Sequence, residues 1–218
     1  MRPCYRKESG GILPAGYAEC EWIRGEDVRK QKLFIDTEYR PNNNTGIFLD
    51  FSHLYISSND FNFFGCKNNQ TDNARFMINV SNLNIVYGFN GYKVVGVIDF
   101  AQRHVVKMNY LNDRKFDVDN GYLSSNITDT LPAMVNNIGI MTSIQSYNPA
   151  DANHYDYKVH VVEITQGNDV VRRFIPCVRL SDMQAGMYEL FGNVCSLTNT
   201  PFFTKVGGTH NFSYQLKS

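Results

Sequence analysis

The sequence lacks the features that mark membrane, secreted and nucleic-acid-binding proteins. No apolar run approaches the roughly 18 residues that a membrane-spanning helix needs. The first residues, MRPCYRKESGGILPAGY, carry basic side chains with no apolar segment behind them, which is not the pattern of a secretory signal. Lys+Arg and Asp+Glu both number 21, so there is none of the basic excess that is typical of nucleic-acid binding. We therefore expect partners other than membranes and nucleic acids.

Cysteine is also scarce, and its spacing excludes two common kinds of site. The odd set of Cys4, Cys20, Cys66, Cys177 and Cys195 contains no C-x-x-C pair and no short Cys/His cluster. It is therefore a poor disulfide framework and a poor zinc site. Cys177 and Cys195 are able to pair only if their strands are neighbours. We expect most of these thiols to be reduced, in a chain that folds in a reducing cytoplasm.

No segment shows a helical period of 3.6 with caps at both ends, whereas period-two alternation recurs along the chain. Turn clusters such as NNNTG, KNNQTDN and TQGND separate the alternating segments. Fifteen Phe and thirteen Tyr fit aromatic-rich strands. The pattern predicts an all-β protein, a two-sheet antiparallel sandwich, with strands within residues 46–56, 74–80, 83–89, 92–100, 103–111, 137–144, 157–165 and 169–180.

The chain contains no internal repeat, charge run or Pro/Ser-rich linker that would divide it. We expect one sandwich domain over residues 13–206. Residues 1–12 are predicted to be an N-terminal extension and residues 207–218 a C-terminal tail. Both extensions would be natural anchors to neighbouring subunits.

One segment resembles the start of a calcium loop. DVDNG, at residues 117–121, places Gly one residue too early for an EF-hand, and position twelve of that loop would be Thr128 instead of Glu. Asn120-Gly121 between two strand-like segments is instead a two-residue hairpin signal. We predict a hairpin and no metal site.

Catalytic patterns are missing as well. The segment ECEWIRGED carries Glu19, Glu21 and Glu26 but not the E-x-D-x-x-E or E-x-D-x-E run of β-sandwich glycosidases. G-x-S-x-G, P-loop and G-x-G-x-x-G motifs do not occur. His104 and His160 lie inside alternating segments, where a histidine is more often structural than catalytic. We therefore expect no enzymatic activity.

The stretch RRFIPCVRLSDMQAGMYEL, residues 172–190, offers two interpretations: a catalytic loop around Cys177 and Asp182, or a strand–turn–strand unit. Pro176 lacks an amide, which favours a strand end or edge. Asp182 and Gly186 favour a chain reversal. We predict a turn, with Cys177 as a small residue of a packed strand.

Several segments, in order, carry a family resemblance that covers residues 13–203. They are LPAGYAECEWI, KLFIDTEYRPNNNTGIFLDF, NFFGCKNN, RHVVKMN, KFDVDNGYL and the closing YKVHVVEITQGNDVVRRFIPCVRLSDMQAGMYEL. Their succession resembles the concanavalin A-like, laminin-G-like jelly-roll domains of phage, prophage and gut bacterial surface proteins. The sequence departs from that pattern at Met183, where the family has Gly.

The resemblance implies a jelly-roll sandwich without general catalytic residues. Because no secretory signal is evident, we expect a virion protein made in the host cytoplasm: a capsid decoration, head-fibre or tail-associated protein. Its partners would be other virion proteins or further copies of itself, and host or mucosal glycans. A bacterial cell-surface lectin is the alternative, and a glycoside hydrolase a remote one. No cofactor is expected.

Glycan binding would require exposed aromatic rings beside Asn or Asp side chains. The candidate residues lie in two predicted loops; they are Asn90, Tyr92, Tyr147, Asn148 and Tyr155. In a lectin, replacing Tyr92 or Tyr147 with Ala would abolish binding. Each tyrosine has the alternative role of covering a sheet edge. Asp151 and Asp156 would be the carboxylates of a laminin-G-type calcium site, although their spacing does not require one.

Overall fold

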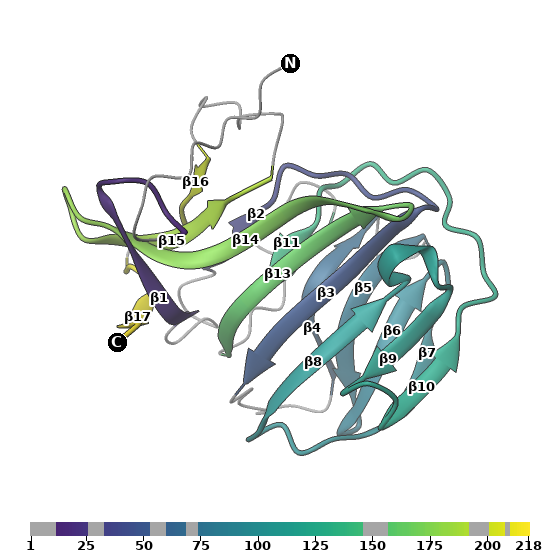
Figure 1. Ribbon diagram of the computed structural model, residues 1–218. Coiled ribbons are helices and arrows are strands. Elements are labelled where there is room, and N and C mark those ends of the chain that lie inside the picture. Colours follow the sequence, from purple (N-terminus) through teal and green to yellow (C-terminus); the bar gives the residue numbers. More distant parts are fainter. Residues whose placement is uncertain are drawn as a thin grey trace.

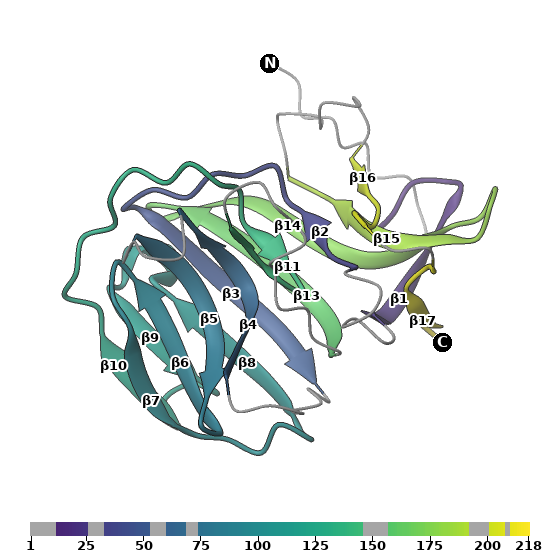
Figure 2. The ribbon, with the colours of Figure 1, turned by 180° about the vertical axis from the view of Figure 1, so that it is seen from behind.

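The protein is all-β, with two sheets packed face to face (Figures 1 and 2). The computed structural model describes residues 12–25, 33–52, 60–68, 74–145, 157–191, 201–207 and 210–218. Within these ranges, one short 3₁₀ helix at Tyr110–Asn112 accompanies the strands. The prediction of an all-β protein with two packed sheets is confirmed.

The larger sheet has ten strands in the order β10-β9-β8-β3-β13-β1-β14-β15-β16, with β17 paired to β1. All of its ladders are antiparallel. Its strands are β1 (Tyr17–Arg24), β3 (Thr45–Ser52), β8 (Arg103–Met108), β9 (Lys115–Val118), β10 (Leu123–Asn126), β13 (Lys158–Gln166), β14 (Asp169–Arg179), β15 (Gln184–Glu189), β16 (Phe202–Phe203) and β17 (Ser213–Leu216).

The smaller sheet has seven strands in the order β2-β11-β4-β5-β6-β7, with β12 running parallel to β4. Its other ladders are antiparallel. Its strands are β2 (Ile35–Asp36), β4 (Asp60–Lys67), β5 (Arg75–Ser81), β6 (Asn84–Phe89), β7 (Lys93–Val97), β11 (Gly139–Ile140) and β12 (Ser143–Gln145). Figure 2 shows β4 to β7 in front of β3 and β8.

The core lies between the sheets because alternate residues of each strand are apolar. In β3, Ile47, Leu49 and Phe51 are fully buried. The Tyr87 ring of β6 stacks on the Phe116 ring of β9, with centroids 4.8 Å apart. This contact joins the two sheets directly.

The predicted strand at residues 137–144 is divided into β11 and β12. The break is at Met141, which has a left-handed backbone (φ 69°). Its amide leaves the ladder and donates to the Tyr157 hydroxyl at 2.9 Å. An apolar run cannot reveal such a break, because the left-handed residue is itself apolar.

The predicted hairpin at Asn120-Gly121 forms between β9 and β10, but its loop has four residues, at positions 119–122. The prediction of a two-residue turn is therefore wrong. Asp119, Asn120 and Gly121 all have positive φ. Asp119 joins the loop because its carboxylate accepts bonds from the Val105 amide and from His104, at 2.8 and 2.7 Å.

One expectation for residues 172–190 needs correction. Gly186 is not in the turn but inside β15, opposite Cys177. It is required there because a Cβ would collide with the Phe203 carbonyl of β16. The reversal occurs at residues 180–183, and its left-handed residue is Met183 (φ 55°). Residues 213–216, within the predicted C-terminal tail, form β17 and pair with β1.

Candidate functional site

The central feature of the larger sheet is a fork between β13 and β14. The two strands form a hairpin whose ladder ends at the pair Val162↔Phe174. Beyond it the strands diverge, and β1 enters between them. Its first residues pair with β14, through Glu19↔Cys177, and its last residues pair with β13. Pro176 lies between the last residue of β14 that pairs with β13, Phe174, and the first that pairs with β1, Cys177.

Pro176 explains why the ladder stops at this place. Along β14 the backbone groups of successive residues point to alternate sides. The Arg173 carbonyl accepts from the Leu190 amide on one side, and the Leu180 amide donates to the Gly16 carbonyl, before β1, on the other. Pro176 is four residues from Leu180, so its nitrogen faces the fork. A proline there loses no ladder bond on the described chain. The prediction was a strand end or edge. Pro176 is not at a strand end: it lies within β14, pairs with Met187 of β15, and has no ladder partner among the described strands on its other side.

Two β-bulges adjoin the fork. In β13, the ladder with β3 passes from Val159 to Val161, so His160 is an extra residue. In β1, the ladder with β17 passes from Cys20 to Trp22, so Glu21 is an extra residue. The β13 bulge places both His160 and Val161 on the outer face of the sheet, beside the fork.

At the fork the outer face forms a pocket of about 490 Å³, called the fork pocket below. This volume lies within the range of about 300–1,000 Å³ that is common for small-molecule sites. Its polar lining comes from five strands or their ends and consists of Glu19, Glu21, Arg103, His160, Arg173, Lys217 and Ser218. Its remaining lining is Ile12, Cys20, Val161 and Ile175.

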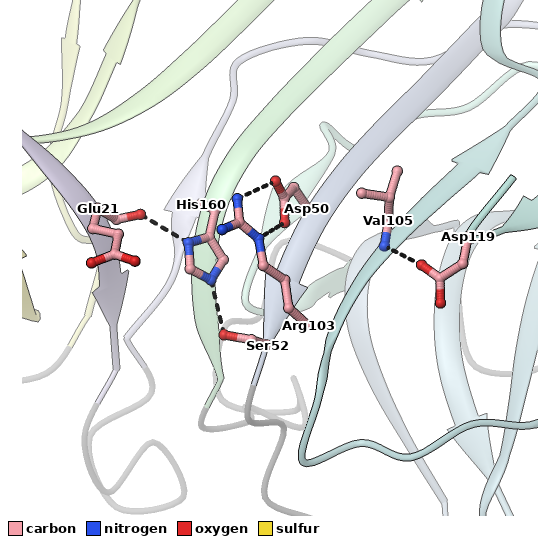
Figure 3. A network of polar contacts seen from close by, with 7 residues as sticks. All are labelled: Glu21, Asp50, Ser52, Arg103, Val105, Asp119 and His160. Atoms are coloured by element: carbon pink, nitrogen blue, oxygen red, sulfur yellow. Dashed lines mark hydrogen bonds and ion pairs between the residues drawn. The ribbon is translucent and has the colours of Figure 1, made fainter.

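Arg103 is anchored at the pocket by Asp50. Its Nε and Nη2 each donate to one carboxylate oxygen of Asp50 at 2.8 Å (Figure 3). Such a two-point pair fixes the guanidinium plane. The hydrogen bond to Asp50 also raises the pKa of Arg103.

His160 is buried and lies between Glu21 and Ser52 (Figure 3). Its Nδ1 is 2.9 Å from the Glu21 carbonyl oxygen, and its Nε2 is 2.8 Å from Ser52 Oγ. The carbonyl only accepts, so Nδ1 carries the proton and the Ser52 hydroxyl donates to Nε2. Burial and the Arg103 guanidinium lower the pKa of His160, against the opposing effect of Asp50. The ring is therefore the neutral form at pH 7.

The Ser52–His160 pair has the atoms of a nucleophile and a base, but the hydroxyl lacks access to the pocket. Ser52 is 2% exposed and does not line the fork pocket. A backbone carbonyl, and not a carboxylate, orients the imidazole. The pair is suited to holding β3, β13 and β1 together.

Two further ion pairs border the pocket. Arg173 Nε lies 3.4 Å from Glu163 Oε1, and Tyr110 donates to the other Glu163 oxygen at 2.6 Å. Burial and this bond raise the pKa of Tyr110 to about 12, so it remains a donor. Lys217 donates to Glu19 Oε1 at 2.6 Å.

Two of the sequence-predicted glycan residues lie elsewhere, on the β6–β7 hairpin. Tyr92 is 45% exposed, with the Arg75 guanidinium over its ring, 5.1 Å from the centroid. Its hydroxyl bonds to Asn79. Asn90 holds a left-handed turn position (φ 62°). Tyr147, Asn148 and Tyr155, and the calcium candidates Asp151 and Asp156, fall outside the described residues.

The described ranges contain no group of three or more His, Cys, Asp or Glu side chains placed to hold a metal ion. No helix among the described residues is long and apolar enough to cross a membrane. A scan against protein-family models found no match, and a search of curated proteins found no relative. The family resemblance of the sequence therefore stays a prediction.

Proposed function

We propose that this chain is a non-enzymatic structural and adhesion module of a phage particle that binds host or mucosal glycans in the fork pocket. The proposed roles are capsid decoration, head fibre or tail-associated protein. The observation that carries the binding part is the fork pocket itself: a hollow in a sheet face, lined by donors and acceptors of both charges. The virion part rests on the sequence resemblance.

We also propose that the two-sheet fold is a concanavalin A-like jelly roll. The strand connections support it, since the chain passes between the sheets from β3 to β4, from β7 to β8, from β10 to β11 and from β12 to β13. The first and last strands of the described residues, β1 and β17, are neighbours in one sheet.

The absence of catalysis is part of the proposal. The carboxylates that line the pocket, Glu19 and Glu21, are the natural candidates for a glycosidase pair. Glu19 is held by Lys217, which supports a binding role for it. Incubation with glycans and a reducing-sugar assay tests this, and turnover that is lost on Glu21→Gln would establish the hydrolase alternative.

Two experiments test the binding and virion parts separately. Calorimetric titration with a panel of glycans measures binding, and we expect millimolar-to-micromolar affinity without turnover. The genes that flank the reading frame test the location. Capsid, portal or tail genes are the expected neighbours, whereas polysaccharide-utilisation genes would favour a bacterial cell-surface lectin.

A further inference from the structure

The ion pairs around the fork pocket share one orientation: the cation is outside and the carboxylate is behind it. Arg103 is 55% exposed and Asp50 10%. Arg173 is 40% exposed and Glu163 12%. Lys217 and Glu19 follow the same order, at 57% and 23%. The positive ends of all three pairs therefore meet the solvent at the pocket.

The guanidinium groups have donors beyond these pairs. Arg103 uses Nε and Nη2 for Asp50, which leaves Nη1 outside the pair. Arg173 approaches Glu163 through Nε only, and neither of its Nη groups has a hydrogen-bond partner among the described residues. Two arginines from different strands thus offer planar N–H donors to one pocket, the arrangement that suits a carboxylate ligand.

The rest of the lining narrows the ligand class. The Glu21 carboxylate has no hydrogen bond or ion pair among the described residues, and it accepts hydrogen bonds only. Glu21 and Glu19 would repel a polyphosphate or a nucleic acid, but they suit sugar hydroxyls. Val161 and Ile175 supply an apolar wall for the C–H face of a sugar ring.

We infer that the fork pocket selects glycans with a carboxylate-bearing sugar, such as a uronate or a sialate. The sugar carboxylate binds Arg173 and Arg103, and its hydroxyls bind Glu21. This inference rests on the proposed glycan binding and adds the chemical class of the ligand.

The experiment is calorimetric titration of the full chain with matched sugars that differ in the acidic group: galacturonate against galactose, and sialyllactose against lactose. Each is repeated with Arg173→Gln, with Arg173→Lys, and with Arg179→Gln as control. Arg179 lies on the same face of β14 but is paired with Asp182, away from the pocket. Circular dichroism and thermal unfolding confirm that the variants are folded.

We expect the acidic sugar of each pair to bind at least roughly tenfold more tightly than the neutral one. Arg173→Gln should remove this preference, Arg173→Lys should weaken it, and Arg179→Gln should leave it intact. Equal binding of acidic and neutral sugars would overturn the inference while the proposed glycan binding stands. Acidic selectivity that survives Arg173→Gln would also overturn it, by placing the ligand elsewhere. Failure of all sugars to bind would overturn both.

Discussion

His160 and Glu21, the extra residues of two separate β-bulges, are joined by a hydrogen bond of 2.9 Å from Nδ1 to the Glu21 carbonyl oxygen. A bulge removes a backbone group from the ladder, and the carbonyl that is freed needs another donor. The imidazole supplies that donor and accepts from Ser52 on its other side. This relay links three strands where the sheet divides, so its protonation state affects stability.

We expect the free energy of unfolding to decrease as the pH falls below about 6.5. The pKa of His160 is lowered in the folded protein. As the pH falls, the imidazole therefore takes up a proton at a higher pH in the unfolded chain than in the folded one. The stabilisation by neutral His160 is therefore fully present at a pH above the pKa of the unfolded chain. It is lost as the pH falls through that pKa toward the lower pKa of the folded protein. Urea unfolding at a series of pH values measures it.

His160→Gln should flatten this pH dependence, because Gln does not titrate. The exposed His210, changed to Gln, is the matched control for the loss of a histidine. Parallel pH profiles for the wild type and His160→Gln would show that His160 is not the titrating group.

Asp50→Asn should lower the free energy of unfolding by about 1.5 kcal/mol, because it removes the charge from a largely buried carboxylate that accepts two hydrogen bonds from Arg103. Asp182→Asn is the control, since Asp182 makes the same two-point contact with Arg179 in an exposed turn. Its effect should be smaller, because exposed pairs contribute little. Chemical denaturation compares the two, and equal effects would contradict the stabilising role of the Asp50–Arg103 pair.

Alternation along the sequence predicts the strands well, because the core faces of β3 and β5 carry alternate apolar residues. The sequence also contains one local pattern that marks the site. In KVHVVEIT, Val161 and Val162 are adjacent, so the apolar face shifts by one residue after Val159. That shift is the pattern expected of a bulge, and it coincides with the bulge at His160.

The fork pocket itself was not predictable from local pattern. Its lining depends on β1 and the residues after β17, which are far from β13 and β14 in the sequence. Pro176 marks the fork, yet a proline in a strand usually indicates an edge. Only the pairing of the other strands shows that its missing amide faces a divergence inside the sheet.

Gly65→Ala should destabilise the protein by about 3 kcal/mol or more. Gly65 has φ 117°, and an added Cβ would collide with the Phe76 carbonyl and the Met77 Cα in the neighbouring strand. Gly167→Ala is the control, since Gly167 also has positive φ (61°) but open space around it, so its cost should be about 1 kcal/mol. Thermal unfolding of both variants measures the difference, and equal losses would show that backbone strain, and not the collision, dominates.

Cys20, Cys66 and Cys177 should resist alkylation in the native protein. All three are free and buried, and burial raises the pKa of each thiol, that of Cys20 to about 12. A thiol above its usual pKa has little of the reactive thiolate. Iodoacetamide labelling followed by mass spectrometry should modify these positions only after unfolding. Rapid native labelling of Cys177 would contradict its place in a packed strand.

Tyr92→Ala distinguishes the two proposed places of glycan contact. The substitution removes the ring beneath Arg75 and the bond to Asn79, so we expect a stability loss of about 1–2 kcal/mol. Tyr92→Phe retains the ring and should recover part of it. Because Tyr92 is not part of the fork pocket, glycan affinity should change much less than in Arg173→Gln, measured by the same titration. Loss of affinity in Tyr92→Ala, with normal affinity in Arg173→Gln, would move the binding site to the β6–β7 hairpin. The exposed face of Tyr92 would then be the stacking platform.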